Sequence, residues 1–218
     1  MALRIGDTAP DFTADTTDGP ISFHDWIGDG YAILFSHPKD FTPVCTTELG
    51  MMAGMAGRFA ERNAKIIGIS VDPVEDHHRW KSDIAAVTGN EVGYPMIGDP
   101  GMKVAKLYDM LPAEASGDPA NRTPADNQTV RTVFIIGPDK KVKLSLTYPM
   151  TTGRNFDEIL RALDSIRLTA EHKVATPANW VQGDDVIITP AVPDDEATER
   201  FGGFERKLPY LRTTKQPG

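Results

Sequence analysis

The chain contains one cysteine, Cys45, and its place in the sequence favours a reactive thiol. An apolar run at residues 31–36 is typical of a buried strand, and the segment after Cys45 has apolar residues at helical spacing. Cys45 is therefore expected in the first turn of a helix. Unpaired N–H groups concentrate partial positive charge there, and this charge stabilises the thiolate, which is the nucleophilic form of cysteine.

The two residues that open this helix are expected to be Thr42 and Pro43. Proline suits the first helical position, which makes Thr42 the N-cap and Cys45 the third helical residue. Two roles are open for the Thr42 hydroxyl group. It can accept a hydrogen bond from the Cys45 amide, or it can point at the sulfur and at an incoming oxygen, and the two roles are compatible.

A single cysteine is often a small core residue without chemistry. Here the polar neighbours Thr42, Thr46 and Thr47 and the junction between loop and helix favour reactivity. No disulfide can form within the chain. A reducing compartment, the cytosol, fits this count and an N-terminal segment without the apolar core of a signal peptide.

The residues before the cysteine carry a recognisable motif. Pro38, Thr42 and Cys45 have the Pro-x-x-x-Thr-x-x-Cys spacing of the peroxiredoxins, and residues 37–49 resemble their one-cysteine subfamily. Similar stretches cover nearly the whole chain, at residues 70–77, 137–141, 148–156 and 168–177. The resemblance implies a thioredoxin-like domain with a C-terminal extension that helps to form a homodimer.

The resemblance also implies roles for individual residues. Cys45 would be the peroxidatic cysteine, and Thr42 and Pro38 would shape and shield its pocket. Arg131, which stands just before an apolar run, matches the active-site arginine of the family. Without the resemblance, Arg131 reads as an ordinary arginine at a strand edge.

The expected substrate pocket contains three further residues. His37 matches the histidine beside the pocket of the family, although alone it could be a plain loop residue. Pro43 and Val44, which directly precede the cysteine, are expected to line the pocket with it.

The implied reaction is the reduction of a peroxide. The thiolate attacks one oxygen, the O–O bond breaks, and a guanidinium with oriented donors stabilises the charge on the departing oxygen. Cys45 becomes a sulfenic acid, and no metal or organic cofactor is required.

One cysteine cannot supply a resolving thiol, so glutathione, a thioredoxin-like protein and ascorbate are open as electron donors. The preference between hydrogen peroxide and lipid hydroperoxides as substrates is open. The expected biological role is antioxidant defence.

Two other functions are weighed against this one. Some relatives are acyl hydrolases that use a serine with a histidine and an aspartate, which His24 and Asp139 match. Gly30 stands where the serine would be, so the nucleophile is missing and such activity is disfavoured. A redox sensor that oxidises slowly and passes the signal to a partner is the second alternative, and its peroxide rate would be close to that of a free thiol.

Other candidate residues receive structural interpretations. His77 and His78 are neighbours and do not face one another on a helix, which disfavours a metal site and predicts surface positions. Met51, Met52 and Met55 are expected to fill the core.

Elements that position these residues follow from apolar spacing and turn residues. Buried strands are predicted at residues 31–36, 65–71 and 132–136, with a hairpin to 142–148. Helices are predicted at residues 44–62, 72–88, 102–108 and 156–168, the last opened by a capping box of Asn155 and Glu158. A long polar loop is predicted at 109–129. The order indicates an α/β fold with a mixed central sheet and helices on both faces.

Length and composition limit the domain organisation and the classes of partner that are expected. The 218 residues are predicted to form a peroxidase domain, residues 1–169, and a small C-terminal extension, residues 170–218, with one clear strand at 186–188. A net charge of −8 disfavours a nucleic-acid partner. No apolar run is long enough to predict membrane insertion.

Overall fold

The computed structural model describes residues 3–115 and 128–218. Most of the polar loop predicted at 109–129 lies outside the described residues. The chain divides into two compact units, Met1–Arg154 and Asn155–Gly218. This division falls before the last long helix, whereas the sequence prediction places the boundary after it, at residues 169/170. No helix of the described part is long and apolar enough to cross a membrane.

The first unit is built on a seven-stranded mixed sheet. In spatial order its strands are β2 (Gly19–Ser22), β1 (Thr13–Thr16), β5 (Met96–Gly98), β4 (Ala64–Ser70), β3 (Tyr31–Ser36), β6 (Arg131–Ile136) and β7 (Val142–Tyr148). Strands β3, β4 and β5 are parallel, while β6 runs antiparallel to β3 and forms a hairpin with β7. The predicted mixed sheet and hairpin are confirmed.

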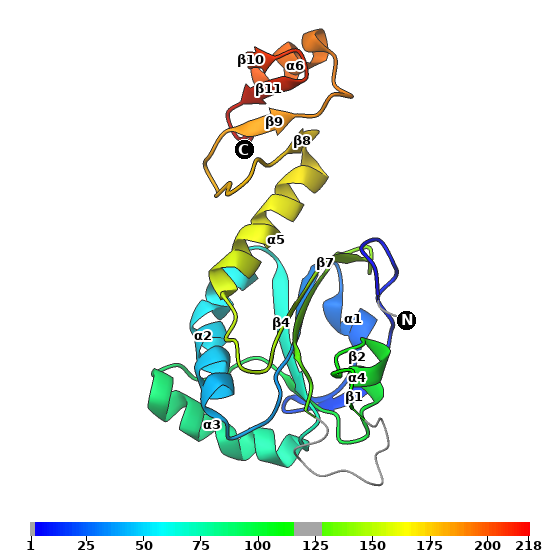
Figure 1. Ribbon diagram of the computed structural model, residues 1–218, viewed down its shortest axis with the longest axis vertical. Coiled ribbons are helices and arrows are strands. Elements are labelled where there is room, and N and C mark those ends of the chain that lie inside the picture. Colours follow the sequence, from blue (N-terminus) through cyan, green and yellow to red (C-terminus); the bar gives the residue numbers. More distant parts are fainter. Residues whose placement is uncertain (1–2, 116–127) are drawn as a thin grey trace. The chain divides into compact units, whose positions relative to one another are not determined.

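Helices cover both faces of this sheet, as predicted (Figure 1). Helices α1 (Phe23–Ile27) and α4 (Lys103–Leu107) lie on one face, and α2 (Pro43–Ala60) and α3 (Val74–Thr88) lie on the other. Strand β3 is buried along nearly its whole length, which explains its continuous apolar run. Its Leu34 packs in one core with Phe23 of α1 and Ala105 of α4.

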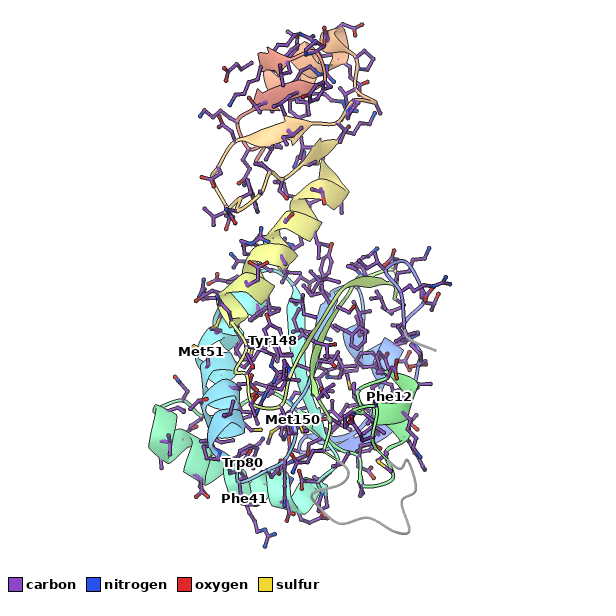
Figure 2. All side chains as sticks on the ribbon, viewed as in Figure 1. Phe12, Phe41, Met51, Trp80, Tyr148 and Met150 are labelled. Carbon is purple, nitrogen blue, oxygen red and sulfur yellow. The ribbon has the colours of Figure 1, made fainter. Side chains whose placement is uncertain are left out.

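The structure adds elements before residue 31, and it corrects one prediction about the core. The added elements are the β1–β2 hairpin and α1, and Gly19 adopts a positive φ of 98° that allows the tight turn of the hairpin. Of the three methionines expected in the core, Met52 and Met55 are buried, but Met51 is 55% exposed on α2 (Figure 2).

The second unit is more structured than the sequence indicates. Helix α5 (Phe156–Glu171) is followed by a four-stranded sheet with the order β10-β11-β9-β8 and by one short helix within it. The bounds are β8 (Val174–Ala175), β9 (Val186–Ile188), α6 (Asp194–Phe201), β10 (Glu205–Leu208) and β11 (Leu211–Thr214). Only β9 was predicted, because the other strands are short and mostly polar. Two small apolar clusters, one around Trp180 and one around Val192, hold this unit together.

The capping box predicted at the start of α5 is half formed. The Asn155 side chain accepts a hydrogen bond from the Glu158 amide at 3.3 Å, as expected of an N-cap. The Glu158 carboxylate instead accepts from Arg161, one turn further along the helix. The competing guanidinium therefore replaces the reciprocal half of the box.

Candidate active site

Cys45 occupies the position in α2 that the sequence predicts. The helix begins at Pro43 after an extended Thr42, so Cys45 is its third residue and lies among the unpaired amides of the first turn. The cysteine is fully buried, with 0% of its surface exposed. The thiol is thus held at a helix N-terminus inside the protein.

Thr42 is the N-cap residue of α2, as predicted, but its hydroxyl does not form the capping hydrogen bond, which is one of the two roles left open for it. It donates a hydrogen bond to the Lys39 carbonyl at 2.8 Å, inside the loop before α2. A hydroxyl has one hydrogen, and here the loop takes it. The lone pairs of the Thr42 oxygen remain able to accept a hydrogen bond from a ligand.

Arg131 lies beside the cysteine sulfur. It begins β6, and its Nη1 atom is 3.4 Å from Cys45 Sγ. The same nitrogen donates to Glu48 Oε2 at 2.6 Å, and Nε donates to the Met150 carbonyl at 2.8 Å. These contacts fix the orientation of the guanidinium. The side chain is only 3% exposed, which differs from an ordinary strand-edge arginine.

Glu48 and Arg154 complete this charged cluster, and sequence reasoning missed both as site residues. Arg154 donates to Glu48 from Nη2 at 2.6 Å, from Nε at 2.9 Å and from its amide at 2.8 Å. Burial by itself raises the pKa of a carboxyl group, but the hydrogen bonds and charge of Arg154, with the charge of Arg131, hold the pKa of Glu48 below its ordinary value.

The charge count of this cluster favours an anion at the sulfur. Two guanidinium groups face one carboxylate, so one positive charge is in excess next to Cys45. A signal for Glu48 was present in the sequence, because residues three apart on a helix share a face and Glu48 is three residues after Cys45. Arg154 is 106 residues from Glu48 and has no such local signal.

The predicted pocket residues differ in their burial. Pro38 and His37 are buried, Val44 is half-buried, and Pro43 is exposed. His37 donates or accepts through Nε2 at 2.7 Å from Asp40 Oδ1. Val44 lies close to Gly153: a Cβ atom added at Gly153 would be 3.6 Å from Val44 Cγ1.

His77 is not a surface histidine, so that prediction is wrong. It is fully buried, and its Nδ1 lies 2.5 Å from Asp40 Oδ2. His78, the next residue, is exposed as predicted. The helical periodicity of α3 turns one histidine towards the interior and the other towards solvent.

The residues that match an acyl-hydrolase triad have other partners. His24 Nε2 lies 2.8 Å from the Ala9 carbonyl, and Asp139 binds Lys143 at 2.7 Å. A Cβ atom at Gly30 would lie 2.5 Å from the Asn63 carbonyl oxygen, so this backbone leaves no room for a serine side chain. The geometry agrees with the missing nucleophile.

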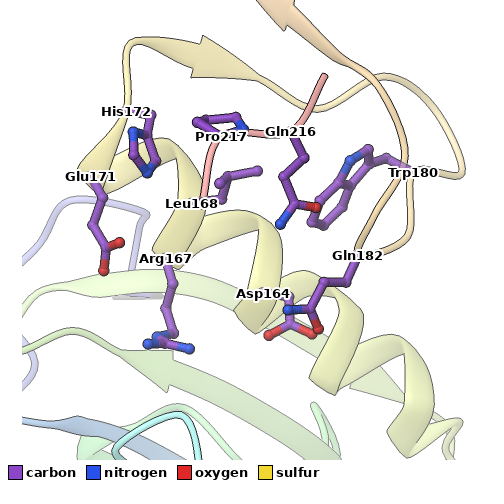
Figure 3. Close-up of a pocket in the computed structure, with 10 residues that line it drawn as sticks. Asp164, Arg167, Leu168, Glu171, His172, Trp180, Gln182, Gln216 and Pro217 are labelled. Atoms are coloured by element: carbon purple, nitrogen blue, oxygen red, sulfur yellow. The ribbon is translucent and has the colours of Figure 1, made fainter. Parts of the chain in front are cut away.

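A separate hollow lies in the second unit (Figure 3). Its lining comes from the end of α5 and from C-terminal residues, and it includes Asp164, Arg167, His172 and Trp180. Charges of both signs are mixed there, and it has no thiol, because Cys45 is the only cysteine of the chain. Thiol chemistry therefore belongs to the first unit.

A buried thiol at a helix N-terminus beside a guanidinium, on a mixed sheet covered by helices, defines a thiol peroxidase of the thioredoxin-like fold. The AhpC/TSA family matches residues 5–145, and the C-terminal domain of 1-Cys peroxiredoxin matches residues 165–203. The chain belongs to the one-cysteine peroxiredoxins of the AhpC/TSA family. It is an oxidoreductase with Cys45 as its single cysteine.

Relatives and solved structures support this placement over the full length. Peroxiredoxin-6 of Rattus norvegicus and of Homo sapiens are each 51% identical over 226 residues, which cover 99% of this chain and 98% of the relative. A cysteine-to-serine mutant of peroxiredoxin 6 from Arenicola marina matches with a TM-score of 0.90 and 46% identity, covering 99% of both chains. A yeast mitochondrial 1-Cys peroxiredoxin matches with a TM-score of 0.89 and 50% identity, covering 98% of this chain and 99% of its own.

Proposed function

We propose that this peroxidase reduces hydrogen peroxide and organic hydroperoxides at Cys45, with Arg131 as the group that stabilises the reacting charges. The observation that carries this proposal is the 3.4 Å contact between Arg131 Nη1 and Cys45 Sγ. A guanidinium at this distance stabilises a thiolate before the reaction and a negatively charged oxygen as the O–O bond breaks. Glu48 and the Met150 carbonyl hold it in place.

The proposed chemical step is a nucleophilic displacement on oxygen. The thiolate sulfur forms a bond to one peroxide oxygen, and the O–O bond breaks with both of its electrons going to the second oxygen. That oxygen takes up a proton and leaves as water or an alcohol. Cys45 is oxidised to a sulfenic acid while the peroxide is reduced.

An external thiol completes the proposed cycle. One thiol condenses with the sulfenic acid to form a mixed disulfide and water, and a second thiol releases Cys45 as a new disulfide forms. The similar yeast protein is described with a thiol-resolving mechanism through glutathione and thioredoxin systems, which supports glutathione or a thioredoxin-like protein as the donor here. We also propose a homodimer and a reducing compartment such as the cytosol.

Oxidation of Cys45 by one equivalent of peroxide tests this proposal directly. We expect intact mass spectrometry to show one added oxygen per chain, a dimedone-type reagent to capture it, and Cys45→Ser to show neither. Excess peroxide should carry the sulfur to sulfinic and sulfonic acid. A covalent dimer as the main product would instead mean that a second subunit resolves the sulfenic acid.

A donor screen then separates the enzyme from a redox sensor. Glutathione, a thioredoxin-like protein and ascorbate are each supplied with hydrogen peroxide, and turnover is followed. Fast oxidation with turnover on at least one donor supports the peroxidase. A peroxide rate near that of a free thiol, with no turnover, would favour the sensor.

A further inference from the structure

Three buried side chains from separate elements form one hydrogen-bonded group beside the active-site loop. Asp40, in the loop before α2, is paired through Oδ1 with His37 Nε2 at 2.7 Å and through Oδ2 with His77 Nδ1 at 2.5 Å. The second nitrogen of His77, Nε2, lies 3.0 Å from the Ile97 carbonyl of β5. All three side chains are at most 1% exposed.

These distances describe hydrogen bonds and not a metal site. The three residue types do bind metals, and their donor atoms lie within 4.8 Å of one another. Two ligand atoms of one tetrahedral zinc ion, each about 2.1 Å from the metal, are about 3.4 Å apart. The observed separations of 2.5 and 2.7 Å are those of hydrogen bonds between a ring nitrogen and a carboxylate oxygen.

The partners of His77 define its protonation state. One ring nitrogen faces a carboxylate and the other faces a carbonyl oxygen, and both of these groups are acceptors. Both nitrogens must therefore carry hydrogen, which makes the ring an imidazolium. His37 needs a proton only at Nε2, since its buried Nδ1 has no hydrogen-bond partner among the described residues.

The electrostatics of the pair agree with this assignment. Burial by itself lowers the pKa of a histidine, but the hydrogen bond and charge of Asp40 outweigh it and raise the pKa of His77. Burial raises the pKa of a carboxyl group, yet hydrogen bonds from His37 and His77 lower the pKa of Asp40 to about 2. The charged groups that face His77 are thus Asp40 and, more weakly, Asp72.

Asp40 is also an anchor of the active-site loop. Its amide donates to Asp72 Oδ2 at 2.9 Å, and it lies two residues from both Pro38 and Thr42. The next residue, Phe41, has a φ of 55°, a left-handed conformation that strains an aromatic residue. Such a conformation persists only when its neighbours are fixed. The start of α2 fixes one side, and Asp40 fixes the other.

Helix α3 holds this loop at a second point. The Phe41 and Trp80 ring centroids are 5.9 Å apart, and both side chains are labelled in Figure 2. The ring centroids of His37 and Trp80 are 5.5 Å apart. Trp80 lies three residues after His77, on the same face of α3. The loop therefore rests on α3 through an ion pair and through aromatic contacts.

We propose that His77 and Asp40 are positioning residues for the peroxidase reaction. Their buried imidazolium–carboxylate pair holds residues 38–42, and with them Thr42 and the first turn of α2 that carries Cys45, in the reactive arrangement. This inference rests on the proposed function of Cys45 and deepens it. The reactive enzyme then needs two conditions at once, a thiolate at Cys45 and a proton on His77.

The variant His77→Asn tests this requirement. An asparagine amide can still donate to Asp40 from nearly the same place, but it carries no charge and does not titrate. His78→Asn is the matched control, because it changes the same residue type at the next, exposed position. The measurement is the rate constant for oxidation of Cys45 by hydrogen peroxide in a single turnover, across the pH range.

The wild-type rate should rise as the thiol ionises and fall at alkaline pH as His77 loses its proton, above the ordinary histidine range. The His77→Asn enzyme should be slower by roughly tenfold near neutral pH and should lack the alkaline fall. His78→Asn should follow the wild type. An alkaline fall that is unchanged in His77→Asn would overturn the positioning role, because a merely structural residue would leave the shape of the profile intact.

A spectroscopic measurement keeps the inference testable if the variant does not fold. Long-range ¹H–¹⁵N correlation spectra of wild-type protein report the protonation of each histidine nitrogen. We expect both nitrogens of His77 to be protonated at neutral pH and to titrate with the alkaline fall in rate. A neutral His77 ring would refute the ion pair, whereas a wild-type rate no faster than a free thiol would refute the proposed function itself.

Discussion

At the scale of single residues, the proposed reactivity of Cys45 rests on Arg131, which contacts two groups at once. Its Nη1 atom contacts both the sulfur and the Glu48 carboxylate. Glu48 alone would neutralise Arg131, but Arg154 donates to the same carboxylate three times and restores the excess positive charge. In the proposed reaction, Glu48 therefore orients Arg131, and Arg154 compensates the positive charge that Glu48 would otherwise neutralise.

Replacing Arg131 by methionine tests this division of charge. Arg131→Met keeps much of the apolar stem and removes the charge and the donors. We expect the thiolate absorbance of Cys45 at a given pH to fall and the peroxide rate to drop by roughly a hundredfold or more, since one oxyanion donor is worth about 2.7–4 kcal/mol in other enzymes. Arg58→Met, at an exposed position on α2, is the control. Unchanged absorbance and rate would return Arg131 to a structural role.

The buried carboxylate of Asp40 predicts a stability change in acid. The pKa of Asp40 is about 2 in the folded protein and near 3.8 when the carboxyl group is exposed. The ionised carboxylate therefore stabilises the folded state above pH 3.8, and this stabilisation is lost as the pH falls from 3.8 towards 2. The difference corresponds to about 2 kcal/mol. Asp40→Asn should lower the free energy of unfolding by about this amount near neutral pH and by much less at about pH 2. Urea unfolding at both pH values checks this, and a constant difference would contradict it.

At the scale of elements, α2, the helix that carries Cys45, packs closely against α3. Gly50 of α2 faces Thr88 of α3, and a Cβ atom at position 50 would overlap the Thr88 side chain. The Thr88 hydroxyl is held by the Ile84 carbonyl at 2.8 Å, so it cannot turn away freely. Glycine is thus required here by the approach of the two helices and not by its backbone angles.

Two glycine substitutions in the same helix separate packing from helix propensity. Gly50→Ala should lower the free energy of unfolding by about 1–3 kcal/mol, because the helices must move apart. Gly57→Ala is the matched control, since nothing lies within 4 Å of a Cβ there, and it should be neutral or stabilising by up to about 1 kcal/mol. Denaturant unfolding measures both variants. Equal effects would show that the close contact does not restrict position 50.

At the scale of the whole molecule, the role proposed for the second unit follows from the small core of its sheet. Its four-stranded sheet and α6 bury two small apolar clusters, one around Trp180 and one around Val192. A sheet with so small a core is expected to bury more of its surface against another surface. The proposed homodimer provides one.

A chain that ends near Thr169 should therefore associate more weakly than the full chain. Such a truncation removes the four-stranded sheet and keeps most of α5 (Phe156–Glu171). Sedimentation at micromolar concentration measures the association of both forms, and thermal unfolding of the truncated chain serves as the folding control. A monomeric full-length chain would contradict the proposed dimer.

The sequence by itself determined the features that depend on neighbouring residues. The first turn around Cys45, the apolar strands 31–36 and 132–136, the hairpin after Ile136 and the lack of a second thiol are all readable within a few positions of the chain. Each is set by local periodicity, by proline and glycine, or by a simple count. The mixed sheet follows from the order of these elements.

Only the tertiary structure decided which buried polar groups meet. Arg154 reaches Glu48 across 106 residues, and His77 reaches Asp40 across 37, although local pattern placed His77 at the surface. Even the Thr42 hydroxyl bonds to Lys39 and not to the helix that its position suggests. Burial removes water from these groups, so each must find a protein partner, and the folding of distant segments determines which partner is within reach.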